Sequence, residues 1–353
     1  MTLEVGTVQG GWDAANGVQF GSTVAGIAST LTVVAGGDLS ALSDQTVRGA
    51  AGDEAVVLAG HAVGGMELGA GDDTLRILQG GRFDLRNFAD TDGDGQRDTE
   101  GASAPNLSFG AGLDDYLDLR TGGVLGLAVV GPDDIGTITG LETFDNRGLI
   151  TLADAGNGGS APGAGDKLYA QAGIYTGFTG ALLHLDARLD AGGATQLTDR
   201  FLIDGGADGT TLVSILNDLG QGAATGNGNT DGISIAQVSG MAGPAAFQLA
   251  NPEVAGAWRY EIVAFDPGSS AASERDVMLP ANPFWDYRLQ SSFYDGVFEY
   301  AALAQGANLL AQAALGGLLE RPDEPPAIAA PAQSADLGAT DAQLAVRPTA
   351  GDG

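Results

Sequence analysis

The chain has 353 residues, with 58 glycines, no cysteine and a formal net charge of −30 from 45 acidic and 15 basic residues. This charge argues against nucleic acid and anionic membranes as partners, since both require clustered Lys and Arg; it favours divalent cations, or simply solubility in salty surroundings. The absence of Cys excludes disulfides, thiolate catalysis and Cys-bound zinc, and it suits an exported protein that crosses a membrane unfolded. No signal peptide is visible, and no apolar run is long enough for a membrane-spanning helix. We therefore expect either a start after an export signal or a fragment.

Residues 1–155 consist of short apolar stretches separated by Gly-Asp turns. None of the stretches has the period of a helix. Each has the length of a strand and is bounded by glycine, which indicates β-structure. Examples are residues 31–34, 56–58, 75–78 and 117–119.

Acidic residues close the Gly-containing turns at a repeating distance. They are Glu54, Asp73, Asp115, Asp134 and Asp154, separated by 19, 42, 19 and 20 residues. The spacing of 42 equals two units, or one unit with an insertion. Apolar residues follow the first three acids at the second and fourth positions, and Ile138 keeps half of that pattern. A period of about 20 residues predicts a β-solenoid whose coils bury their faces by stacking. A β-sandwich with Gly-rich loops would explain the strands but not their spacing.

After about residue 140 the apolar stretches lengthen and alternate more cleanly. We interpret residues 182–187, 200–203, 212–215, 233–236 and 258–263 as half-buried antiparallel or capping strands. Residues 296–320 have apolar residues among Ala and Gln, which predicts a helix. Prolines at 322, 325 and 326 end it, and the Ala/Pro/Asp-rich remainder to residue 353 is predicted to be disordered.

An ordered series of motifs between residues 138 and 290 resembles a known module. The series is similar to the pertactin-like, or autochaperone, module at the end of bacterial autotransporter passengers. The segments that carry the resemblance are Ile138–Leu152, Gly165–Leu168, Ile174–Gly177, Leu183–Asp186, Thr198–Gly206, Gly209–Val213, Asp231–Ile233, Phe247–Leu249, Val254–Tyr260 and Trp285–Leu289.

The resemblance implies an all-β fold: a right-handed parallel β-helix (solenoid) with a C-terminal capping module, then a short helix and a disordered tail. We expect β-helix coils over 1–139 with an inserted loop near 84–105, the autochaperone cap over 140–292, a linker helix over 293–321 and the tail over 322–353. The cap would fold first, template the upstream coils and seal the open solenoid end. Aromatic residues that could supply its bulk are Phe247, Trp258, Tyr260, Phe265, Trp285 and Tyr287.

In function, the resemblance implies a non-enzymatic secreted or cell-surface passenger, presumed monomeric, that acts as an adhesin or matrix-binding scaffold. Its surface ligand, whether a glycan, matrix or another cell, is unknown. An outer-membrane barrel should follow in the family pattern but is missing from this chain. We therefore expect a truncated product, a cleaved passenger or a partial gene.

One loop has the residue pattern of a calcium site. Oxygen ligands at alternate positions and a glycine at the sixth follow the DxDxDG calcium loop, with candidate ligands Asp90, Asp92, Asp94, Gln96 and Asp98. Position 12 is Gly101 instead of Glu. The loop predicts bound Ca²⁺ and, as an alternative function, a calcium-dependent secreted structural protein of the RTX or surface-layer type. A solvated acidic loop between coils would explain the residues equally and would account for the spacing of 42.

Other chemistry has weaker support in the sequence. The turns at 69–75 and 110–117 resemble RTX calcium repeats but lack their tandem spacing, which favours plain turn capping. No GxSxG, HExxH or phosphate-loop motif occurs, and we interpret His184 as a surface or packed residue. Stacked acids at 72/73, 114/115 and 133/134 could act in acid/base catalysis on a polysaccharide. Basic partners for an anionic sugar are scarce, so this enzyme is the least favoured alternative.

Overall fold

The computed structural model describes residues 2–11, 16–86, 88–89, 99–100, 107–127, 135–153, 163–193, 197–294, 305 and 307–312. The chain divides into two units, Met1–Phe298 and Glu299–Gly353. Within the second unit, residues 305 and 307–312 are helical; the rest of the predicted linker helix and the tail at 322–353 lie outside the described residues.

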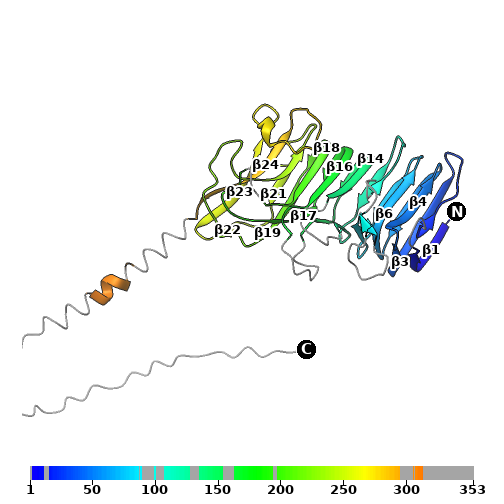
Figure 1. Ribbon diagram of the computed structural model, residues 1–353, viewed down its shortest axis with the longest axis horizontal. Helices are drawn as coiled ribbons and strands as arrows, with labels where there is room; N and C mark the ends of the chain where they lie inside the picture. The colour runs from blue at the N-terminus through cyan, green and yellow to red at the C-terminus, as the bar shows by residue number, and fades with distance from the viewer. Residues whose placement is uncertain are drawn as a thin grey trace, which may run out of the picture. The chain divides into compact units, whose positions relative to one another are not determined.

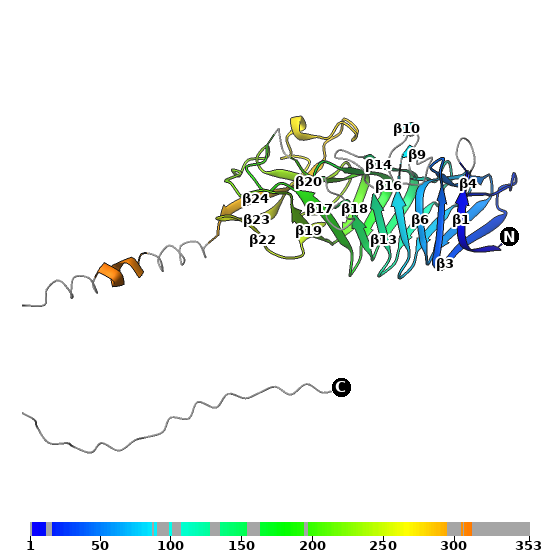
Figure 2. The same cartoon turned by 60° about the horizontal axis from the view of Figure 1, so that its bottom comes forward.

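The first unit is almost entirely β-structure, which confirms the predicted all-β class. Its described residues form 24 strands and one short 3-10 helix, η1 (Ala272–Glu274). Most strands pair in parallel, and the pairings form three ladders. Figure 1 shows strands of the third ladder, such as β6, β14, β16 and β18, side by side along the first unit, and Figure 2 gives the same stack from a second direction.

The first ladder contains the strands that follow the acidic turns. Strand β1 (Thr2–Gly10) pairs with the start of β3 and, further along, with its end. The ladder then runs through the start of β3 (Ala28–Ala41), β5 (Asp53–Leu58), β7 (Thr74–Ile77), β12 (Tyr116–Leu119) and the ends of β14 (Ile135–Asn146), β16 (Lys167–Gly177) and β18 (Arg200–Gly209).

The other two ladders are built in the same way from the intervening segments. The second runs through the end of β3, the start of β6 (His61–Gly69), β8 (Arg82–Leu85), β13 (Val124–Leu127), β15 (Leu149–Thr151), β17 (Leu182–Ala187), β19 (Thr211–Asn217) and β21 (Phe247–Leu249). The third runs through β2 (Val18–Gln19), β4 (Gln45–Ala50), the end of β6, β11 (Leu107–Ser108), the starts of β14, β16 and β18, and β20 (Ile233–Val238).

The register explains the irregular spacing of the acidic turns. Leu75 pairs directly with Leu117, so the 42 residues between Asp73 and Asp115 are one coil with an insertion. The insertion includes a short antiparallel pair, β9 (Phe88–Ala89) with β10 (Thr99–Glu100). The predicted inward positions are confirmed, because the following side chains are fully buried: Val56, Leu58, Leu75, Ile77, Leu117 and Leu119.

One part of the predicted repeat is wrong. Ile138 does not continue the first ladder, because it pairs with Leu107 in the third. Phe144 takes the position after Leu117 instead. The count of 19 residues from Asp115 fails since this coil is longer than its predecessors, and sequence spacing alone does not reveal where a coil has lengthened.

The interpretation of residues 182–236 as antiparallel strands is also wrong. Strands β17, β18 and β19 continue the parallel ladders, and β20 still pairs in parallel with β18. Alternating burial reports only that one face of a strand is buried, and it is the same for both pairing directions. These parallel pairings run across residue 140 without a break.

Candidate functional site

The parallel ladders end at three antiparallel strands. Strand β20 pairs antiparallel with β24 (Trp285–Phe293), which pairs with β23 (Trp258–Phe265), which in turn pairs with β22 (Glu253–Ala255). We call β22–β24 and the connecting residues 266–284 the cap. It lies at the end of the stack near the C-terminal side of the first unit (Figure 1). The free edge of β20, which would otherwise offer unpaired backbone groups, is thereby covered.

A column of buried aromatic rings joins the last coils to the cap. Ring centroids are 5.1 Å apart for Phe144 and Tyr175, 5.2 Å for Tyr175 and Phe201, and 6.2 Å for Phe201 and Phe247. Phe247 then meets Tyr287 of β24 at 4.9 Å. All five rings are buried, and their edge-to-face geometry is favourable beyond the area they bury. Of the aromatic residues predicted for the cap, Phe247, Tyr260 and Tyr287 are buried, while Trp258, Phe265 and Trp285 are partly so.

A fully buried arginine fixes the cap strand to the last coil. The Arg288 guanidinium contacts Asp286 at 2.8 Å and Glu274 at 3.2 Å. It also donates to the carbonyls of Asp231 at 2.8 Å and Gly232 at 3.1 Å. Burial raises the pKa of Asp286, and the Arg288 charge partly offsets that shift. Removing one member of such a cluster would leave a buried charge unpaired, which is strongly destabilising.

The lysine of the chain, Lys167, anchors residues 266–284 to the coils. Asp276 is buried and lies 2.8 Å from Lys167 Nζ on β16 and 3.2 Å from Arg200 Nη1 on β18. Its backbone N–H donates to Gln237 on β20 at 2.8 Å. Burial favours the neutral acid, but the hydrogen bond and charge of Lys167 outweigh it and lower the pKa of Asp276. Three successive strands of the third ladder thus hold one carboxylate.

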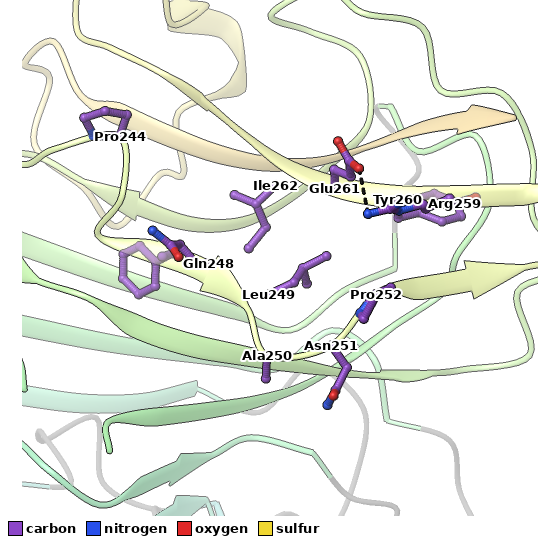
Figure 3. Close-up of a pocket in the computed structure, with 11 residues that line it drawn as sticks. Pro244, Gln248, Leu249, Ala250, Asn251, Pro252, Arg259, Tyr260, Glu261 and Ile262 are labelled. Carbon is purple, nitrogen blue, oxygen red and sulfur yellow. Dashed lines mark ion pairs between the residues drawn. The ribbon is translucent and has the colours of Figure 1, made fainter. Parts of the chain in front are cut away.

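An open groove of about 350 Å³ lies where the second ladder meets the cap. Strand β21 forms one side and β23 the other (Figure 3), with Gln248, Leu249 and Ile262 among the lining residues. The ion pair between Arg259 and Glu261, 3.2 Å long, lies on the β23 side. The groove has polar and apolar walls but no cluster of catalytic groups among the residues that line it.

The acidic turns form a column of carboxylates along one edge of the first ladder. The Glu54 N–H donates to Asp73 Oδ1 at 2.7 Å, the Asp73 N–H to Asp115 Oδ1 at 2.7 Å, and the Asp115 N–H to Glu142 Oε2 at 2.8 Å. Burial raises the pKa of Asp73 to about 7 and that of Asp115 to about 6, and it also raises the pKa of Glu54. Each acid therefore caps a turn in the neighbouring coil.

Glu142 is the member of this column that the sequence analysis missed. The signal was present, because Gly140-Leu141-Glu142 repeats the arrangement of Gly52-Asp53-Glu54 and Gly71-Asp72-Asp73, with Phe144 as the following apolar residue. The analysis placed the next acid at Asp134, which lies outside the described residues, as does Asp154.

A second capping carboxylate occurs among the late coils. Asp199 accepts hydrogen bonds from the backbone N–H groups of Gly165, Asp166 and Asp186 at 3.0, 3.1 and 2.7 Å. Burial raises the pKa of Asp199 to about 8 despite these bonds.

The predicted calcium ligands Asp90, Asp92, Asp94, Gln96 and Asp98 lie outside the described residues. Within the described part of the chain, no group of three or more His, Cys, Asp or Glu side chains could hold a metal ion. Of the paired acids considered for catalysis, Asp73 and Asp115 are buried, whereas Asp72 and Asp114 are exposed.

The two histidines have different environments. His61 lies between Asp38 at 3.1 Å and Asp84 at 3.0 Å, and the hydrogen bond to Asp84 is the main cause that raises its pKa. His184 is half-buried on β17, where desolvation lowers its pKa.

The fold and cap define a class: an all-β protein of stacked parallel strands whose final strand is covered by an antiparallel, aromatic-rich segment. A comparison with protein families places residues 146–262 in the family described as Autochaperone Domain Type 1. The match begins at the end of β14 and ends within β23, so it covers the late coils and the first part of the cap. The chain is thus an autotransporter passenger with an autochaperone module, as the sequence motifs predicted.

The same identification implies an outer-membrane barrel in the same precursor, and secretion or association with the outer membrane. No curated protein matches the chain. Within the described residues, no helix has the length and apolar character needed to cross a bilayer.

Proposed function

We propose that the chain is a right-handed parallel β-helix displayed at or released from the bacterial surface, and that residues 140–292 start its folding. The observation that carries this proposal is the antiparallel closure of β20 by β24, which sits on the Phe247–Tyr287 contact and the Arg288 cluster. Support for the β-helix comes from the order in which successive coils visit the three ladders. The match at 146–262 supports the folding role.

Energetics favour a start at the cap end. Many coil strands are only four residues long, such as β7, β12 and β13, and each has strand partners only in adjacent coils. Such a coil cannot bury its apolar face until a neighbour is in place. The cap end has longer strands and buried ionic contacts, so it can form first and offer a complete edge to the next coil.

Refolding kinetics of the full chain test this order. Two matched substitutions remove the same atoms from fully buried sites: Leu289→Ala in β24 and Leu58→Ala in β5. Each should cost about 2–5 kcal/mol in free energy of unfolding. We expect Leu289→Ala to slow refolding, with a φ-value above about 0.5, and Leu58→Ala mainly to speed unfolding, with a φ-value near 0. The opposite assignment of φ-values would refute the proposed order.

We further propose that the passenger acts as a non-enzymatic adhesin. A stack of coils supports this role because it presents long, regular outward faces on a rigid scaffold. Bacteria that display the chain should adhere to glycan- or matrix-coated surfaces more than cells that display an unrelated passenger. Turnover of a polysaccharide by the purified chain would instead favour the enzyme alternative.

Calcium dependence is the second candidate, and the DxDxDG pattern at 90–98 favours it. Calcium binding to the folded state should raise the melting temperature of the chain. The double substitution Asp92→Ala and Asp94→Ala should abolish that increase. A melting temperature that does not change between calcium and EDTA would exclude this candidate.

A further inference from the structure

Three arginines converge on one buried carboxylate on the outer surface of the first ladder. Arg76 Nε lies 2.9 Å from Asp118 Oδ2, Arg120 Nε lies 2.7 Å from the same oxygen, and Arg147 Nη1 lies 3.5 Å from Oδ1. We call Arg76, Arg120 and Arg147 the arginine patch. In a chain with 45 acidic and 15 basic residues, such a concentration of positive charge is unexpected.

Strand register brings these residues together from distant parts of the sequence. Asp118 pairs with Arg76 of β7 on one side and with Asp145 of β14 on the other. The backbone N–H of Arg120 donates to Ile77, and that of Arg147 to Leu119, so both arginines extend the same ladder. The patch therefore spans three successive coils, about 4.8 Å apart.

The charges of the patch exceed what its carboxylates require. Asp145 accepts from Arg147 at 3.1 Å, so two carboxylates face three guanidinium groups. One guanidinium would suffice to pair the buried Asp118, and each additional one adds repulsion between like charges. The patch thus has one uncompensated positive charge.

The unused donors of the patch face solvent. Arg76 and Arg120 bind Asp118 through Nε, and their side chains are 39% and 47% exposed. Within the part of the chain that the structure describes, the terminal Nη atoms of these two arginines have no hydrogen-bond partner. The carboxylate thus orients two guanidinium forks outward, which lowers the entropy lost on binding an anion.

We propose that the arginine patch binds a sulfate group of a sulfated polysaccharide. A planar carboxylate is matched by a single guanidinium fork, whereas donors from three coils surround an anion whose oxygens are not coplanar, as in sulfate. Beside the patch, the Arg147 guanidinium lies 3.7 Å from the ring centroid of Phe178, which is 38% exposed and offers an apolar surface to a sugar. Nucleic acid does not fit, since it requires an extended basic surface. The inference rests on the proposed adhesin role and names its ligand class.

Binding of the purified full chain to three immobilised polymers with one backbone tests the proposal: dextran sulfate, carboxymethyl dextran and dextran. At about 0.15 M salt the Debye length is about 8 Å, so distant acidic residues are largely screened. We expect retention on dextran sulfate only. Arg76→Gln with Arg120→Gln should weaken it by about tenfold or more, because each charged hydrogen bond contributes about that factor. Arg120→Lys keeps the charge but loses the fork and should weaken binding less.

The control removes the same charge from two exposed arginines elsewhere. Arg48→Gln with Arg259→Gln breaks ion pairs to Glu67 and Glu261 and should leave retention unchanged. If the patch variant melts at a lower temperature, adding Asp118→Asn removes the buried charge and keeps the comparison valid.

Three results would overturn the inference. Equal retention on carboxymethyl dextran would show that sulfate is not recognised. An equal loss in the control variant would show that only net charge matters. No retention of the wild-type chain, while cells that display it still adhere, would reject the sulfate site and leave the adhesin role standing.

Discussion

At the residue scale, the carboxylate column links folding to pH. Asp73 and Asp115 have pKa values of about 7 and about 6, raised by burial, and Asp199 has one of about 8. In the unfolded chain these groups titrate near 4. Between these values the folded state holds more protons than the unfolded state. The stabilisation is therefore complete below about pH 4 and is lost as pH rises through 6 to 8.

The first prediction follows for Asp73→Asn. The amide oxygen can still accept the Glu54 N–H, but no charge is buried at high pH. We expect the free energy of unfolding of the wild-type chain to fall between pH 5 and pH 8, by up to about 1.4 kcal/mol per pH unit for each proton involved. The variant should show a shallower fall and a higher melting temperature at pH 8, measured by thermal melts across this range.

Asp72→Asn is the matched control, because Asp72 is exposed and adjacent. It should leave the pH profile as in the wild type. A variant at Asp73 that keeps the full pH slope would show that the column does not carry the linkage. The His61 contribution has the same sign, since its raised pKa also favours the folded state at lower pH, and Asp73→Asn leaves it in place.

The candidate site could be predicted from sequence only where its residues follow a local pattern. The turn acids Glu54, Asp73 and Asp115 follow glycine and precede alternating apolar residues, so their stacking was predictable. The contacts of the arginine patch were not, because Arg76 and Asp118 are 42 residues apart and meet only through the register of β7 with β12. Composition showed that basic residues are scarce but not that three of them gather in one place.

At the scale of single elements, the strand-length segments were predictable but their pairing direction was not. The predicted strands at 182–187 and 200–203 exist as β17 and within β18, and their alternation gave the buried face correctly. Direction depends on the path of the connecting residues. Those residues carry no periodic signal, so the change from parallel to antiparallel at β24 is visible only in the structure.

The second prediction concerns the aromatic column that joins coil and cap. Phe247 of β21 contacts Tyr175, Phe201 and Tyr287, and it is 1% exposed. Phe247→Ala should lower the free energy of unfolding by about 3–5 kcal/mol, since a cavity would separate the last coil from β24. Chemical denaturation at constant pH measures the change.

Val254→Ala in β22 is the control in the same region, because Val254 is 43% exposed. It should change stability by less than about 0.5 kcal/mol. A loss below about 1 kcal/mol for Phe247→Ala would mean that the column is not a main link between coil and cap.

At the scale of the whole first unit, stability should vary along the stack. Coils pair only with neighbouring coils through the three ladders, so an opening at one position need not disturb distant coils. Strand β1 is largely exposed, whereas every residue of β20 is buried. The period of the acidic turns predicted this stacked organisation. The long late coils and the ionic clusters of the cap were not predictable, because their contacts join residues up to 76 positions apart.

The third prediction is a gradient of hydrogen-exchange protection under native conditions. Amides of β18 and β20 should exchange only through the global unfolding reaction, whereas those of β1 and the start of β3 should exchange through smaller openings of lower free energy. Leu58→Ala should lower protection in β3 and β5 and leave β20 nearly unchanged, because the substituted coil is remote from the cap. Leu289→Ala should lower protection in β18 and β20, and also in the early coils if these depend on the cap as a template. Uniform protection of β1 and β20 in the wild-type chain would mean that the unit unfolds as a single cooperative block, and the cap would then have no separate stability from which folding could start.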